Sequence, residues 1–255
     1  LERNLYKMKI HCISDTHTRH QEIELSGGDV LIHSGDILSK PDPSQLTEFL
    51  VWFSEQNYTT KIFIAGNHDH LFEQRPDLIK KLLRMFPSLI YLQDSDVTID
   101  GIKFYGAPWI PTNRPGKAFS YLRTAYDIAK SHWSKIPNDT DVLITHGPAY
   151  KKLDKIMKPI RKDQTQLNLG CPQLAERIKT INPQLHICGH IHSSQGILDI
   201  SEPTTTYINA ASLGEDYQYS NKRRFIEWEI LKTTSEIGLQ GNGIKLTIGK
   251  QEQAK

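Results

Sequence analysis

One pattern recurs along the chain: a short run of apolar residues that ends directly in aspartate, asparagine or histidine. Continuous apolar runs of this length are typical of β-strands buried on both faces of a sheet. Amphipathic helical patterns lie between several of these runs. The predicted strands cover residues 9–14, 30–34, 62–65, 142–145 and 185–188, and the predicted helices cover residues 43–56, 77–86, 121–135 and 172–181. This alternation is typical of an α/β fold with parallel strands.

A second pattern predicts antiparallel strands. Residues 97–99 and 102–105 flank Asp100 and Gly101, and Asp-Gly is a strong signal for a two-residue hairpin turn. The chain has no linker rich in proline, glycine and serine. We therefore expect an α/β fold of two mixed β-sheets that pack together with helices outside. Further strands are predicted at residues 197–200, 205–208, 224–230 and 244–248.

The polar residues that follow the five buried runs are of the types that bind metal ions. In an open α/β sheet, the carboxyl ends of the strands form the crevice that binds ligands. Two carboxylates, an amide oxygen and four imidazoles suit Mn²⁺, Fe or Zn²⁺. They are too many for one ion and suit two ions that share a bridging carboxylate. The candidate metal ligands are Asp15, His17, Asp36, Asn67, His146, His190 and His192.

The spacing of these residues leads to a more detailed expectation. Asp15 and His17 are two positions apart, as are His190 and His192, so at an extended strand end both side chains of a pair are expected on the same side. The glycines before Asp36, Asn67 and His190 are expected to allow tight turns. Two metal ions about 3.5–4 Å apart polarise phosphate oxygens and convert bound water to hydroxide near neutral pH. The pattern therefore predicts phosphoryl chemistry.

The order of the five polar clusters resembles that of the calcineurin-like metallophosphoesterase superfamily. Additional segments resemble the narrower metallophosphoesterase-domain-containing (MPPED-type) subgroup, namely residues 15–19, 104–109, 145–148, 170–171, 185–187 and 207–210. The resemblance implies a four-layer αββα sandwich of two mixed β-sheets flanked by helices. It also implies a single domain over residues 1–255, with a core at about 8–231 and a C-terminal extension at 232–255.

The resemblance further implies how the ligands divide between two divalent metal ions. Asp36 is expected to bridge the ions. Mn²⁺ is the expected metal, with Fe, Zn²⁺ and Mg²⁺ as alternatives. The implied ligands are Asp15, His17, Asp36 and His192 for the first ion, and Asp36, Asn67, His146 and His190 for the second.

The expected activity is hydrolysis of small phosphodiesters by attack of a metal-bound hydroxide, and the resemblance to the subgroup implies cyclic nucleotides as the substrate class. His68 is expected to be catalytic, donating a proton or stabilising charge at the leaving oxygen, with Asp69 orienting its ring. Arg19, Asn67 and His68 are expected to contact the substrate, since a guanidinium suits phosphate oxygens. The alternatives are a phosphomonoesterase or protein phosphatase that uses the same ions, a nuclease, and a non-catalytic nucleotide-binding protein.

The charge balance limits the partners. The chain has 31 basic and 29 acidic residues, a net charge of +2, which is too little to hold a long nucleic acid by phosphate neutralisation. We therefore expect a small phosphodiester or nucleotide substrate and no stable nucleic-acid complex. The apolar stretch at residues 49–53 is far shorter than the ~20 residues of a membrane span, so no membrane association is expected. The sequence leaves the oligomeric state open.

The remaining histidines, cysteines and tryptophan have less specific interpretations. His11, His33 and His186 lie inside predicted strands, where packing roles are expected. Trp109 is expected either to line the substrate cleft or to pack in the core. Three cysteines with no C-x-x-C pair and no secretory signal predict reduced thiols and a cytoplasmic location.

Overall fold

The structure is a computed structural model of the chain. It describes residues 4–114, 116–157, 167–199, 205–219 and 225–234. The strand predicted at residues 244–248 lies outside this part of the chain. The single domain predicted over residues 1–255, with its extension at 232–255, stays a prediction.

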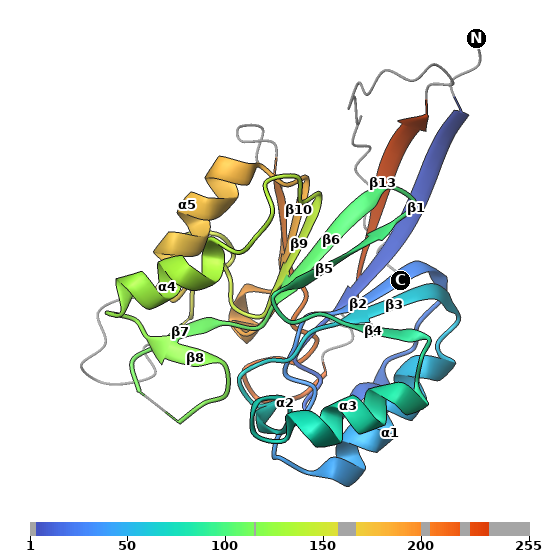
Figure 1. Cartoon of the computed structure of the whole chain (residues 1–255), viewed down its shortest axis with the longest axis horizontal. Coiled ribbons are helices and arrows are strands. Elements are labelled where there is room, and N and C mark those ends of the chain that lie inside the picture. Colours follow the sequence, from blue (N-terminus) through green and yellow to red (C-terminus); the bar gives the residue numbers. More distant parts are fainter. Residues whose placement is uncertain (1–3, 115, 158–166, 200–204, 220–224, 235–255) are drawn as a thin grey trace.

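The first sheet has five strands in the order β13-β1-β2-β3-β4. Strands β1 to β4 are parallel to one another, and β13 pairs with β1 in the antiparallel direction. The strands are β1 (Asn4–Ile13), β2 (Gly28–His33), β3 (Tyr58–Phe63), β4 (Leu89–Tyr91) and β13 (Ile226–Thr234). Helices α1 (Pro43–Glu55) and α3 (Pro76–Met85) cover one face of this sheet (Figure 1).

Helix α1 shows why this segment becomes helical. Asp42 caps it, since its carboxylate accepts a hydrogen bond from the Ser44 amide, and Pro43 occupies the first helical position. Leu46, Phe49 and Phe53 lie on the face that is buried against the sheet. A short helix, α2 (His70–Gln74), precedes α3.

The second sheet has six strands in the order β11-β12-β10-β9-β6-β5. The four central strands are parallel, and the two edge strands are antiparallel to their neighbours. The strands are β5 (Ser95–Ile99), β6 (Ile102–Ala107), β9 (Val142–Thr145), β10 (Leu185–Cys188), β11 (Gly196–Asp199) and β12 (Thr206–Asn209). The predicted hairpin is confirmed as β5 and β6. Asp100 and Gly101 have φ values of 49° and 74°, the left-handed pair that its two-residue turn requires.

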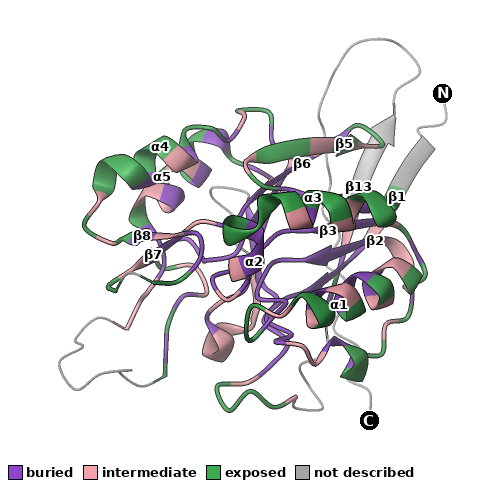
Figure 2. Cartoon of the chain, turned by 60° about the horizontal axis from the view of Figure 1, so that its bottom comes forward, coloured by how far each residue is buried: buried purple, intermediate pink, exposed green. Residues whose placement is uncertain are grey.

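Helices α4 (Tyr126–Trp133) and α5 (Pro172–Ile181) cover the outer face of the second sheet (Figure 1). The two sheets pack face to face through a shared apolar core that includes Ile32, Phe104 and Ile144. The strands of the inner layers are mostly buried, whereas the outward sides of the helices are exposed (Figure 2). The predicted four-layer αββα sandwich of two mixed sheets is therefore confirmed.

The structure differs from the predicted elements where short segments pair over long distances. The helix predicted at residues 121–135 begins only at Tyr126, because Ser120–Leu122 forms β8 and pairs with β7 (Ile110–Thr112). Strand β4 and helix α2 were not predicted either. Such short elements carry little local signal, and their pairing partners determine them.

Candidate functional site

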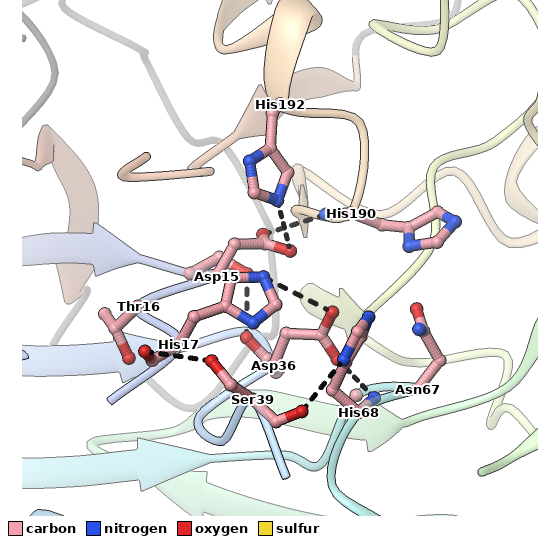
Figure 3. Close-up of polar contacts among 12 residues, drawn as sticks. Asp15, Thr16, His17, Asp36, Ser39, Asn67, His68, His190 and His192 are labelled. Carbon is pink, nitrogen blue, oxygen red and sulfur yellow. Dashed lines mark hydrogen bonds and ion pairs between the residues drawn. The ribbon is translucent and has the colours of Figure 1, made fainter. Parts of the chain in front are cut away.

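All five predicted polar clusters lie at the carboxyl ends of parallel strands. Strands β1, β2 and β3 supply three clusters from the first sheet, and β9 and β10 supply two from the second sheet. The two sheets join beside these ends, where Ser14 and Ala211 form a parallel bridge and the Ser212 amide donates to the Ser14 carbonyl at 2.8 Å. Side chains far apart in the sequence therefore meet at one place (Figure 3).

A first group consists of Asp15, His17 and His192. Each residue offers one ligand atom, and the three atoms lie within 4.8 Å of one another. His192 Nε2 is 3.5 Å from Asp15 Oδ1. Asp15 and His17 are buried and His192 is partly buried. The group has the composition and size of a metal site.

A second group consists of Asp36, His146 and His190, again with ligand atoms within 4.8 Å of one another. Asn67 adjoins this group, because its Oδ1 atom is 3.1 Å from His146 Nε2. The rings of His146 and His190 lie 5.1 Å apart between centroids. All seven predicted ligands therefore lie in or beside the two groups.

Asp36 belongs to the second group and also faces the first. Its Oδ2 atom is 3.8 Å from His17 Nε2 in the first group, and its Oδ1 atom is 3.4 Å from His146 Nε2 in the second. Oδ1 also accepts a hydrogen bond from the His68 amide at 2.8 Å. One carboxylate thus faces both groups with different oxygens, which is the arrangement that a bridging ligand needs.

Three of the histidines are oriented by main-chain carbonyls. Nδ1 of His17 donates to the Leu38 carbonyl at 3.3 Å and Nδ1 of His192 to the Gly214 carbonyl at 2.9 Å. His146 makes the same kind of bond, at 3.0 Å, to the carbonyl of Ser34. In each ring Nε2 is left to face the carboxylates. Histidines that bind metals are held in this way, because the second nitrogen fixes the ring and its tautomer.

One buried atom provides an independent test of whether a cation fits. His17 Nε2 is buried and has no hydrogen-bond partner among the described residues. Buried polar atoms nearly always have a partner. A divalent cation between His17 and Asp36 would supply it, so the residues present fit a metal ion.

Burial and neighbouring charges shift the pKa values of the residues in the two groups. Burial lowers the pKa of His190 to about 3, which keeps this imidazole neutral. Burial alone would raise the pKa of Asp15 and of Asp36, but the nearby His192 and His146 lower both below their usual range. Burial would likewise lower the pKa of His146, but Asp36 outweighs it and raises that pKa to about 9, so this imidazole must release a proton when it binds a metal ion. Both carboxylates therefore stay ionised in a buried site.

The backbone at the strand ends corrects one expectation. Asp15, His17, Asp36 and His190 have φ values of 54°, 44°, 55° and 67°, in the left-handed region that residues other than glycine rarely adopt. The predicted extended geometry is wrong, because β1 and β10 end before these residues and the chain turns. The paired histidines also separate: His190 joins the second group and His192 the first.

The glycines that precede the ligands are required by close backbone approach, as predicted. A Cβ atom on Gly66 would collide with the main-chain nitrogen and the carboxylate of Asp36. A Cβ atom on Gly189 would collide with the side chains of Ser14 and Asp15. Glycine therefore lets the loops of the two sheets pack against the candidate ligands.

His68 lies beside the first group. Its ring meets the His17 ring edge to face, 5.0 Å apart between centroids. Its Nδ1 atom is 3.4 Å from the Ser39 carbonyl, and its Nε2 atom is 3.0 Å from the Lys117 ammonium. Lys117 is not among the candidate residues that the sequence indicated.

Asp69 does not orient His68. Its carboxylate accepts hydrogen bonds from the main-chain amides of Ile37 at 3.1 Å, Leu38 at 2.8 Å and Gly66 at 2.7 Å. The expected Asp69–His68 contact is therefore wrong, because these bonds tie the loop after β2 to the loop after β3. Burial, with the added charge of Asp36, raises the pKa of Asp69 to about 7.

Arg19 is engaged by the protein itself. Its Nε and Nη2 atoms donate to Glu22 at 2.7 and 2.8 Å, and Nη1 donates to the Tyr217 carbonyl and to Gln218 Oε1. These bonds correct the expectation that the guanidinium is free to bind phosphate. They also point to Tyr217, a side chain at the site that sequence reasoning missed.

The other histidines and Trp109 have packing roles. His33 and His186 are buried and contact Thr16 and Thr145 at 3.0 and 2.8 Å. Trp109 is partly buried, stacks on His132 at the margin of the core and donates to Asp94, contacts that accord with the packing alternative. The three cysteines are buried and free, so none forms a disulfide.

Comparison with known proteins gives a consistent result. The family model of the calcineurin-like phosphoesterases matches residues 8–194. The chain is 38% identical over 231 residues to Metallophosphoesterase domain-containing protein 1 of Homo sapiens, and equally to that of Mus musculus, covering 82% of this chain and 68% of each relative. The crystal structure of TT1561 of Thermus thermophilus shares the fold, with a TM-score of 0.58 at 16% identity over 87% of this chain and 98% of that one. Within the described residues, no helix has the length and apolar character needed to cross a membrane.

Proposed function

Because the chain belongs to the calcineurin-like phosphoesterase family, we propose that it is a dinuclear phosphodiesterase that hydrolyses small phosphodiesters such as cyclic nucleotides. Membership of this family makes it a metal-dependent hydrolase of phosphoric esters. The preference for diesters, the ligand assignments and the choice of metal are the parts that we propose.

The position of Asp36 carries the proposal. Its two oxygens face His17 and His146, which belong to different groups. We assign Asp15, His17, Asp36 and His192 to one ion, and Asp36, Asn67, His146 and His190 to the other. The mixture of oxygen and nitrogen donors suits Mn²⁺.

Two divalent cations, when held by these groups, would supply Lewis acidity, which withdraws charge from phosphate oxygens and lowers the pKa of water. The chain supplies orientation and hydrogen bonds around them. The His68 ring and the Lys117 ammonium, 3.0 Å apart, lie beside the first group. We propose that this pair donates hydrogen bonds to the phosphate or to the leaving oxygen, where charge develops.

The side-chain charges beside the two groups support the proposed preference for a diester over a monoester. A phosphodiester carries one negative charge, whereas a monoester carries up to two near neutral pH. Arg19 is neutralised by Glu22 and tied to the loop at residues 217–218, so its guanidinium is not presented to a dianion. Lys117 then supplies a single positive charge beside His68.

The test is an assay with added Mn²⁺ that compares bis-p-nitrophenyl phosphate, p-nitrophenyl phosphate, 2′,3′-cyclic AMP and 3′,5′-cyclic AMP. We expect at least one diester to be hydrolysed faster than the monoester. Asp36→Ala is expected to abolish hydrolysis and to lower the bound metal, measured by elemental analysis. If the monoester is hydrolysed far faster than every diester, the protein is a phosphomonoesterase or protein phosphatase instead. Full activity of Asp36→Ala would refute the ligand assignment.

We also propose that the substrate is a small molecule and that the protein is cytoplasmic. The net charge of +2 provides little attraction for a nucleic-acid polymer. The three free, buried cysteines are consistent with a reducing compartment.

A further inference from the structure

The loop that follows β12 carries an aromatic side chain to the first group. Strand β12 ends at Asn209, the last of the parallel strand ends at this edge. The Tyr217 ring lies 5.0 Å from the His17 ring and 5.2 Å from the His192 ring, measured between centroids. Tyr217 is nevertheless 48% exposed. It contacts two candidate metal ligands and also presents a surface to solvent.

The loop is fixed to the site at several points. The Gly214 carbonyl accepts the bond that orients His192, and the Gly214 amide donates to the Gln218 carbonyl at 2.9 Å. The Tyr217 amide donates back to the Gly214 carbonyl at 2.9 Å. Tyr217 has a φ of 57°, a left-handed conformation that costs free energy and persists only where neighbours impose it. The loop thus holds the ring against the first group.

Arg19 fastens this loop to the loop that carries Asp15 and His17. Its guanidinium donates to the Tyr217 carbonyl and to Gln218, and it lies 5.3 Å from the centre of the Tyr219 ring. The Tyr219 hydroxyl donates to the Arg19 carbonyl at 3.0 Å. Glu22 holds the other edge of the guanidinium at 2.7 Å. Arg19 is therefore placed to set the position of Tyr217.

We propose that Tyr217 is a specificity-determining residue, which contacts the organic group of the substrate and favours diesters whose alcohol carries a planar ring. Arg19 is its positioning residue. An exposed aromatic ring next to a phosphate site offers a face on which a planar ring stacks. This inference rests on the proposed phosphodiesterase function.

The experiment uses two diesters with the same leaving group, so that the chemistry of the cleaved bond is constant. They are the p-nitrophenyl ester of thymidine 5′-monophosphate and methyl p-nitrophenyl phosphate. The readout is the ratio of their kcat/KM values with Mn²⁺ present. A structural disturbance would lower both values and leave the ratio unchanged.

We expect Tyr217→Ala to lower this ratio at least fivefold through a higher KM for the thymidine ester, with bound metal unchanged. Tyr217→Phe keeps the ring and is expected to keep the ratio within twofold of the native value. Arg19→Met is expected to lower the ratio in the same direction, and Arg19→Lys to restore part of it. Tyr126→Ala removes an exposed tyrosine of α4 and is the matched control.

An unchanged ratio in Tyr217→Ala overturns the proposal, as does loss of bound metal in that variant. If native protein hydrolyses neither diester, the proposed function fails, and calorimetry of the Mn²⁺-loaded protein then tests Tyr217 separately. Thymidine 5′-monophosphate is expected to bind at least fivefold more weakly to Tyr217→Ala, with methyl phosphate unaffected. Equal weakening for both ligands contradicts the stacking role.

Discussion

Asp36 illustrates how much a single side chain contributes to this site. It is buried, and burial by itself would raise the pKa of its carboxyl group. The charges and hydrogen bonding of His146 and the charge of His17 reverse this effect and hold the pKa well below its usual range. A buried anion with imidazoles on two sides is a strong attractor for divalent cations.

His68 is expected to act on the substrate and not on the metal. We expect His68→Ala to retain bound metal and to lower kcat at least tenfold, since a positioned acid contributes about 10²–10⁴-fold. Steady-state kinetics with elemental analysis measures both. His70→Ala, a nearby partly exposed histidine, is the control and is expected to stay within twofold. Metal loss in His68→Ala would make His68 a ligand.

The buried ring of His20 is expected to make the stability of the protein depend on pH. The residue is 1% exposed against Phe49 and Trp52, and neither ring nitrogen has a hydrogen-bond partner among the described residues. Burial lowers its pKa to about 4. Between pH 6.5 and 4 the unfolded chain therefore binds a proton that the folded chain does not, so stability falls as the pH falls through this range.

Replacing this histidine should remove its part of the effect. When the pH is lowered from about 7 to about 5, we expect the free energy of unfolding to fall in both proteins. The fall in His20→Leu should be smaller than that in the native chain by about 2 kcal/mol. Urea unfolding of the metal-free protein at both pH values measures the difference, with His70→Leu as the control. An identical pH dependence in His20→Leu and native protein would contradict this role.

At the scale of elements, the strand ends are where sequence and conformation are most tightly linked. The chain leaves β1, β2 and β10 through left-handed residues, and Asp15, Asp36 and His190 are among them. Such conformations cost on the order of 1–3 kcal/mol each and cluster at functional sites. The packed loops around the two groups hold them in place.

Gly66 is a position at the scale of elements where a Cβ atom would meet main chain, at 2.2 Å from the Asp36 nitrogen. We expect Gly66→Ala to lower the free energy of unfolding by about 1–3 kcal/mol, because the added Cβ forces Asp36 away. It should also weaken Mn²⁺ binding, since Asp36 is the proposed bridge. Gly28→Ala is the control, because its added Cβ would make much longer contacts, at 3.2 Å to Tyr58 and 3.4 Å to Lys9. Equal stability and Mn²⁺ affinity in the two variants would refute the requirement.

At the scale of the whole molecule, the two sheets meet at the site. The candidate ligands come from both sheets: Asp15, His17, Asp36 and Asn67 from the first, and His146, His190 and His192 from the second. A cation bound by both sets is therefore expected to stabilise the association of the two sheets, in addition to the apolar core between them. Binding to the folded state alone shifts the folding equilibrium by mass action.

Metal removal should therefore lower thermal stability. Filling one site at a hundredfold excess over Kd adds about 2.7 kcal/mol, which raises Tm by about 5 °C or more in a chain of this size. Differential scanning calorimetry with Mn²⁺ and with EDTA measures this shift. Asp36→Asn should lose most of the shift, whereas Tyr126→Ala on α4 should keep it. A Tm that is the same with Mn²⁺ and EDTA would contradict cation binding by the two groups.

The sequence by itself determined the layers and the set of candidate ligands. Apolar periodicity and the Asp-Gly turn are local signals, and they predicted most of the strands and helices within a few residues. The polar residues at strand ends were identifiable because parallel strands bring their carboxyl ends to one edge, whatever the details of the loops.

Only the tertiary structure decided which residues pair across the loops. The separation of His190 from His192, the bonds of Asp69 to main-chain amides and the contact of Arg19 with Tyr217 all join residues through turns that no local pattern encodes. The physical reason is that a left-handed residue redirects the chain, and the packing of neighbouring loops, far away in sequence, determines which residue adopts that conformation.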